Sequence, residues 1–531
     1  MIFKHVALQE QGEFVYVLGG LEAGDDTYVV AAEALVAVTH VCRHWRQVAL
    51  DAPTLWTRIF NGDPERMAVF VERSRKAPYS LYLVTTTWML SESFGTLPRD
   101  RLRRLDLMLI QPPHTHLGRS SFSTLVAPAL ECFTVDNSDD YHSSDPERLE
   151  WVRILEGKTD SLQALALCYI GGWAPSNAFP HLTHFHLTYC RDVETHTADL
   201  LVILANAPNL EFVYIGQQLD RPMDVKPSSP RPVVLSHLRS LTLNACSYKR
   251  ATNLLKHLSL SEDCFVRLSE VVGEIDNPRP IATLTSLRRP TTLDIGISNE
   301  EMFLVADSPT SGVWMETRMG GGRIRDLWFL NLPSTITLSG ITSLRICLIY
   351  GSTTFWSTFL RGLPALVELK VLSGCHDEDP EGTCPLATLC NVLSAEPVCL
   401  PSLRDLYIRE LRFHSVVEHN LKLLYLTMVD MAAFRARSGR RLHRFHMRLR
   451  CRRQLEKLEL FATHTAKIED HVDDFRLTGD DLYLSPIELF NMRDVWHVVG
   501  SEKYWRLSER DQPTYPLLLT DGSGWRWNRR R

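Results

Sequence analysis

A chain of 531 residues with 44% hydrophobic and 23% charged residues has the composition of a folded globular protein, which excludes a disordered or a membrane-embedded chain. A net charge of −5 gives no overall attraction to nucleic acid or to an anionic membrane. The twelve cysteines fall among predicted buried strands, and the N-terminus has no secretory pattern. We therefore expect a soluble intracellular protein, cytoplasmic or nuclear, with no membrane or nucleic-acid partner.

The stretch from residue 38 to residue 59 has the clearest pattern in the chain. Its first half predicts an amphipathic helix, since five residues recur at helical spacing on one face: Val38, Val41, Cys42, Trp45 and Ala49. Asp51 can accept from free amides of the following turn, and Pro53 fits the first positions of a helix. A second short helix is thus predicted, presenting Leu55, Trp56 and Ile59 beside the first.

The order Val-Cys-Arg-x-Trp-Arg-x-x-Ala-x-x-x-Pro-x-Leu-Trp at residues 41–56 resembles the second half of the F-box in large fungal F-box protein families. The resemblance implies an adaptor whose F-box docks on the Skp-type subunit of a cullin–RING ubiquitin ligase while the rest of the chain presents a target protein. It implies a partner-binding face formed by Val38, Val41, Cys42, Trp45, Pro53, Leu55 and Trp56. The alternative interpretation is a helical hairpin whose two tryptophans are core residues.

The F-box-like region is expected to cover residues 1–60 with an incomplete first helix. Residues 1–6 resemble the end of the first F-box helix, and the Leu-Pro part that precedes it in the family is absent. Either the start codon is assigned too far downstream, or the protein has lost part of its docking surface. The Gly-rich stretch at about residues 11–33 is expected to be an inserted loop. Residues 61–100 form a connection, with a helix predicted at 64–74 and a strand at 80–84.

A short motif then recurs: a Leu, two other residues, an apolar residue, one further residue and another apolar residue. Successive copies start mostly about 20 to 34 residues apart, the range of leucine-rich repeats. The copies are Leu102-Leu105-Leu107, Leu130-Phe133-Val135, Leu162-Leu165-Leu167, Leu182-Phe185-Leu187, Leu210-Val213-Ile215, Leu238-Leu241-Leu243, Leu344-Cys347-Ile349, Leu366-Leu369-Val371, Leu403-Leu406-Ile408, Leu421-Leu424-Leu426 and Leu455-Leu458-Leu460.

The motif predicts stacked strands. Its last two apolar residues lie two apart, so they point to the same face of a strand, and one unit can bury that face only against its neighbours. The expected fold is α/β: a small helical module, then an irregular leucine-rich-repeat solenoid at residues 101–462, with parallel strands on one face and helices or loops on the other. Residues 463–531 are expected to form an irregular extension with a basic tail. An unrelated α/β domain with several buried strands is the alternative.

No residue pattern indicates an enzyme, a cofactor or a metal site. The densest Cys/His group, Cys375, His376, Cys384, Cys390 and Cys399, has none of the paired spacings of a zinc module. Polar, Pro-rich stretches at 136–146, 220–232, 277–280 and 376–385 are predicted surface loops that contact a target. The sequence therefore favours a non-catalytic substrate-recognition adaptor, and the alternative is a protein-binding scaffold that has lost ligase recruitment.

Overall fold

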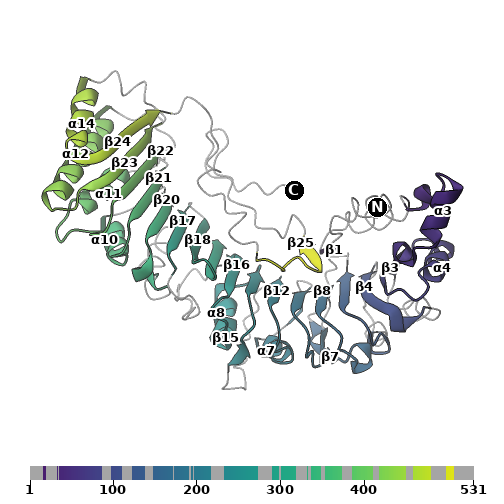
Figure 1. Ribbon diagram of the computed structural model, residues 1–531. Coiled ribbons are helices and arrows are strands. Elements are labelled where there is room, and N and C mark those ends of the chain that lie inside the picture. The colour runs from purple at the N-terminus through teal and green to yellow at the C-terminus, as the bar shows by residue number, and fades with distance from the viewer. Residues whose placement is uncertain are drawn as a thin grey trace. The chain divides into compact units, whose positions relative to one another are not determined.

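The structure is a computed structural model (Figure 1). It divides into two compact units, unit 1 (residues 1–246, 257–261 and 496–514) and unit 2 (247–256, 262–495 and 515–531). It describes residues 16–18, 33, 35–85, 97–109, 122–137, 147–170, 173–189, 193–194, 197–216, 232–272, 290–297, 301–318, 332, 336–348, 353–373, 385–410, 418–449, 459–479 and 498–507.

Unit 1 begins with a small helical module. Residues 35–39 are helical and are followed by α3 (Arg43–Leu50), the 3-10 helix η1 (Pro53–Trp56), β2 (Arg58–Phe60) and α4 (Pro64–Arg73). Asp63 starts α4 by accepting hydrogen bonds from two amides of its first turn, and Pro64 occupies a position where no N–H is needed. The helix predicted at 64–74 is confirmed.

A parallel sheet follows in unit 1, whose strands lie side by side in chain order, while short strands between some of them belong to separate pairs. The order is β2, β3 (Tyr79–Thr85), β4 (Leu102–Leu109), β5 (Cys132–Asn137), β8 (Ala164–Ile170), β10 (His184–Tyr189), β12 (Phe212–Gly216) and β14 (Ser240–Asn244). The strand predicted at 80–84 is therefore confirmed as β3.

The repeated motif sets the register of this sheet. The first strand residues of six successive copies pair in one row, namely Leu105, Phe133, Leu165, Phe185, Val213 and Leu241. Their second residues form the next row on the same face, and all are buried. Because parallel pairing aligns equivalent positions, each apolar pair is covered by the pairs beside it.

Short elements complete unit 1. They are η3 (Arg99–Arg101), η4 (Leu155–Gly157), α7 (Thr197–Ala205) and four two-stranded parallel pairs: β1 (Tyr16–Leu18) with β25 (Trp505–Leu507), β6 (Glu147–Arg148) with β11 (Val193–Glu194), β7 (Glu150–Val152) with β9 (Trp173–Pro175), and β13 (Val233–Leu235) with β15 (Leu258–Leu260).

Two histidines of β10 lie on the sheet face opposite the leucine rows. The His186 ring stacks on Tyr214 with 4.3 Å between ring centroids, and no group in the described ranges bonds to His186 Nδ1. Burial lowers the pKa of His184 to about 4 and that of His186 to about 3. Both rings are therefore neutral at pH 7.

This burial predicts acid sensitivity of unit 1. Between the unfolded pKa of about 6.5 and the folded values, the unfolded state binds more protons, so the free energy of unfolding falls as pH falls through that window. His186→Phe keeps an aromatic ring on Tyr214 and removes one titrating group. We expect the slope of unfolding free energy against pH, measured by urea unfolding between pH 6.5 and 4.5, to decrease by up to roughly 1.4 kcal/mol per pH unit. Identical slopes in both proteins would contradict the prediction.

Unit 2 contains a second row of strands. Its order is β16 (Phe265–Val272), β19 (Gly312–Arg318), β18 (Glu301–Asp307), β17 (Thr292–Ile297), β20 (Ser343–Leu348), β21 (Glu368–Ser373), β22 (Asp405–Glu410), β23 (Leu442–Leu449) and β24 (Val472–Gly479). Neighbouring strands are parallel except that β18 is antiparallel to β17 and β19.

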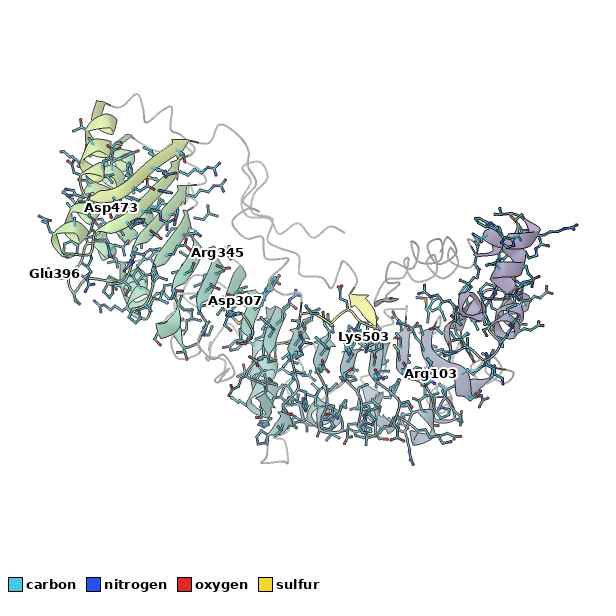
Figure 2. The ribbon with its side chains drawn as sticks, in the orientation of Figure 1. Arg103, Asp307, Arg345, Glu396, Asp473 and Lys503 are labelled. Atoms are coloured by element: carbon cyan, nitrogen blue, oxygen red, sulfur yellow. The ribbon has the colours of Figure 1, made fainter. Side chains whose placement is uncertain are left out.

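One face of the unit 2 sheet is apolar and the other is charged. The apolar rows include Leu344, Leu369, Leu406 and Phe445, and Figure 1 shows helices α10 (Thr353–Arg361), α11 (Pro385–Leu393), α12 (Glu418–Arg437) and α14 (Glu459–Glu469) beside these strands. On the charged face Arg345, labelled in Figure 2, pairs with Asp294, and Arg444 pairs with Asp405. The remaining elements are α8 (Tyr248–Lys256) and η5 (Leu338–Gly340).

The strands of the two sheets extend beyond residues 101 and 462, the predicted limits of the repeat array. Strands β2 and β3 come before residue 101, and β24 comes after residue 462. The predicted copy at 421–426 is wrong, since it lies inside α12. The copy at 344–349 is shifted: Leu344 and Ile346 are the buried strand residues, and Ile341 takes the position of the first Leu. Residues 455 and 458 of the last predicted copy lie outside the described ranges.

Candidate functional site

The module at the start of unit 1 contains every residue of the predicted partner-binding face. The prediction of one amphipathic helix through Val38 and Ala49 is wrong, because residues 38–50 do not form a single helix. Helical residues end at Thr39, Val41 lies in a bend, and α3 starts at Arg43. Cys42 has an extended backbone and caps α3, its Sγ accepting from the Trp45 amide at 3.5 Å. Because of this break, α3 does not continue the preceding helical turn.

One hydrogen bond joins the two helical segments, and a second lies within the first of them. Arg46 Nε donates to the carbonyl of Thr39 at 3.1 Å, across the break. The Thr39 hydroxyl in turn donates to the carbonyl of Val36 at 2.6 Å. Carbonyl groups at a helix end have no partner within the helix, so these bonds satisfy acceptors that would otherwise depend on water.

Trp56, predicted on the partner-binding face, is an internal residue instead. Its side chain is 0% exposed, and its Nε1 donates to the carbonyl of Ala49 at 2.8 Å. Its ring packs edge-on against Phe70 of α4 and lies under the guanidinium of Arg73 at 4.4 Å. Trp56 thus joins α3, η1 and α4, and a partner protein cannot reach it in this fold.

The other predicted face residues remain accessible to different extents. Val41 is 61% exposed and Cys42 is also exposed, whereas Val38, Trp45, Pro53 and Leu55 are partly buried. Ala49, placed on the same predicted helix face, is buried.

Sequence reasoning missed Val48, which is 36% exposed. Trp45 and Val48 of α3 are three residues apart, the spacing at which side chains share one side of a helix, and that spacing was a signal available in the sequence. We call three accessible apolar side chains at the bend and on α3 the docking patch: the exposed Val41 and Val48 and the partly exposed Trp45.

Basic residues lie next to the docking patch in the sequence. Arg43, His44 and Arg46 of α3 are exposed, and α3 contains no acidic residue. Asp51, at the end of α3, accepts from Gln47 Nε2 at 3.0 Å. An apolar centre with a polar rim is the usual anatomy of a protein–protein interface, and enriched tryptophan and arginine are typical of its energetically important part.

Other predictions about this region fall on residues that the structure leaves undescribed. These are the incomplete first helix at residues 1–6, most of the inserted loop at 11–33, most of each predicted target-contacting loop and the basic tail. Across the described ranges, no three His, Cys, Asp or Glu side chains are placed to hold a metal ion. No helix within the same ranges combines the length and the apolar character needed to cross a membrane.

Comparison with known proteins agrees with the module described above. The F-box-like family model matches residues 27–62, a range that contains the docking patch and Trp56. A comparison with curated proteins finds no match for the chain. Residues 27–62 therefore form an F-box-like domain, followed by a mixed α/β region with extensive parallel sheet.

Proposed function

We propose that this protein is a non-catalytic substrate-recognition adaptor of a Skp/cullin/F-box-type ubiquitin ligase. The observation that carries the proposal is the F-box-like domain with exposed Val41 and Val48 and a partly exposed Trp45. F-box domains generally bind Skp-type proteins, and an exposed apolar surface in a folded protein often marks an interaction site. In this proposal the docking patch contacts the Skp-type subunit.

The α/β region would hold the target protein, and we propose that it is a leucine-rich-repeat-like array. Support comes from the parallel strands of unit 1, which follow one another in chain order with equivalent motif positions in register. Unit 2 repeats this arrangement from β20 to β24. Repeats of this kind bury their apolar residues against adjacent repeats and leave the opposite sheet face for ligands.

The docking patch can be tested with a charge substitution. Val41→Glu places a carboxylate on the docking patch without disturbing a buried side chain, so we expect at least a tenfold loss of co-purified Skp-type protein, since a buried unpaired charge is costly. Val234→Glu is the matched control, because Val234 of β13 is 60% exposed and lies outside the F-box-like domain. Quantitative co-purification from cells measures both variants.

Equal recovery of the Skp-type protein with both variants would contradict the placement of the docking patch. Absence of that protein from the wild-type complex, with another protein bound, would support the scaffold function instead.

A further inference from the structure

The segment from residue 498 to residue 507, here called the strap, lies on the unit 1 sheet. Its last three residues form β25, and Figure 1 shows β25 on the opposite side of the sheet from α7. Tyr504 and Trp505 are buried there among side chains of β3, β4, β5 and β8. Lys503, labelled in Figure 2, is exposed and lies 4.7 Å from the centre of the Tyr504 ring.

The strands beneath the strap carry small side chains. The central members of the buried cluster are Cys132, Ala164, Ala166 and Cys168, all on β5 or β8. Larger side chains stand on both sides: Tyr82 and Met108 belong to the same cluster, and His184 of β10 contacts both strap aromatics edge-on. Small residues at the centre allow the rings of Tyr504 and Trp505 to approach the strands closely.

Polar contacts fix the position of the strap along the sheet. The Tyr504 hydroxyl donates to Gln163 Oε1 at 2.8 Å, and His184 Nε2 donates to the carbonyl of Gly500, also at 2.8 Å. Gly500 has φ = +99°, and a Cβ there would lie 3.3 Å from the Phe212 ring. A residue other than glycine would therefore strain this turn.

The sheet does not need the strap for its own hydrogen bonds. β5, β8 and β10 each pair with a parallel strand on both sides, and the backbone partner of β25 is β1 instead. The strap is more than 300 residues away in sequence from the groups that hold it. Its removal would therefore expose a formed aromatic and apolar surface and leave every strand pair of the sheet intact.

We propose that this face of unit 1 is a binding site for an extended peptide with two adjacent aromatic residues, and that the strap occupies the site in cis. A partner segment of the same chemistry then binds by displacing the strap. The identification of that partner as a ligase target rests on the proposed function, whereas the binding site itself does not.

The test uses the full chain and a fluorescein-labelled synthetic peptide with the sequence of residues 498–507. Tyr504→Ala combined with Trp505→Ala removes the aromatics that compete in cis, so we expect fluorescence anisotropy to show at least tenfold tighter peptide binding than in the wild type. A peptide with alanine at both aromatic positions is the control and should bind neither protein. Adding Ala166→Leu to the double variant fills the space of the aromatics and should abolish binding.

A second variant keeps the proposal testable if the double variant fails to fold by circular dichroism. Gly500→Ala retains both aromatics and weakens only the turn, so it should also bind the peptide more tightly than the wild type. Equal binding by the wild type and the folded variants, or binding of the alanine peptide, would overturn the proposal. Co-purification of the Skp-type protein is a separate measurement, so failure of the ligase function and failure of this site give different results.

Discussion

Trp56→Ala is expected to unfold the F-box-like domain under conditions in which the wild type is folded. Truncating a buried tryptophan costs about 3–5 kcal/mol. Here the change removes the edge-on contact with Phe70, the Arg73 contact and the hydrogen bond to Ala49 at once. Hydrogen exchange read by mass spectrometry should show faster exchange across α3 and α4, and co-purification of a Skp-type protein should be lost.

Two comparisons separate packing from docking. Trp56→Phe keeps an aromatic ring against Phe70 and loses the indole N–H, so we expect a smaller loss of about 1–3 kcal/mol. Trp45→Ala should leave exchange in α4 nearly unchanged and still reduce docking, because Trp45 is partly exposed. If Trp45→Ala destabilised the domain as strongly as Trp56→Ala, the division of roles between the two tryptophans would be wrong.

The sequence could not show that Trp56 is a packing residue and Trp45 a docking residue. Both tryptophans occur in the same motif at fixed spacing, and periodicity identifies the apolar side of a helix without saying what covers it. In the structure, Phe70 and Arg73 of α4 pack against the Trp56 ring and bury it. The break at Cys42 was equally hard to predict, because Val38, Val41 and Trp45 match an unbroken helix and the cap is a cysteine, which is not among the preferred capping residues.

The repeated motif predicted most of the sheet correctly, since two apolar residues two apart define the buried face of a strand. It failed at 421–426, where Leu424, Tyr425, Met428 and Met431 are buried at helical spacing. The correct copies at 182, 210, 366 and 403 have a proline two residues earlier, and the copy at 421 does not. Proline ends a preceding helix and so supports these four copies, but the correct copies at 102, 162 and 238 also lack it, and the leucines alone did not distinguish strand from helix.

The strap could not be predicted from local pattern at all. Tyr504 and Trp505 follow a stretch without periodicity, and their partners are more than 300 residues earlier in the chain. In the sequence, the alanines and cysteines of β5 and β8 do not differ from ordinary strand residues. Only the fold places these small side chains next to one another, on neighbouring strands and in register.

Arg435 is the most buried cation in the described part of the chain, and its loss is expected to destabilise unit 2. The residue lies in α12 and is 0% exposed. Its guanidinium donates to the carbonyls of Cys399, Leu400 and Leu403 at 3.1 to 3.2 Å. Leu400 has φ = +54°, a conformation that is unfavourable for leucine, so Arg435 holds a strained turn between α11 and β22.

Arg435→Met should lower the free energy of unfolding of unit 2 by about 3 kcal/mol. Three carbonyls lose the Arg435 donor, although the Leu400 carbonyl keeps the Leu403 amide at 3.1 Å, and each lost bond costs up to roughly 1–3 kcal/mol. The removal of a buried charge offsets part of this cost, because desolvation already lowers the pKa of Arg435 to about 10 and thus opposes its charged form. The loss of hydrogen bonds is larger, so the net effect is destabilising.

Arg437→Met is the matched control in the same helix, since Arg437 is exposed and a surface change of this kind stays within about 0.5 kcal/mol. Urea unfolding gives the total change, and hydrogen exchange in β22 and α12 assigns it to unit 2. Arg435→Lys keeps a positive charge but has one nitrogen in place of a planar fork, so it cannot reproduce three separate bonds. If Arg435→Lys were as stable as the wild type, charge would matter at this position and the three-carbonyl geometry would not.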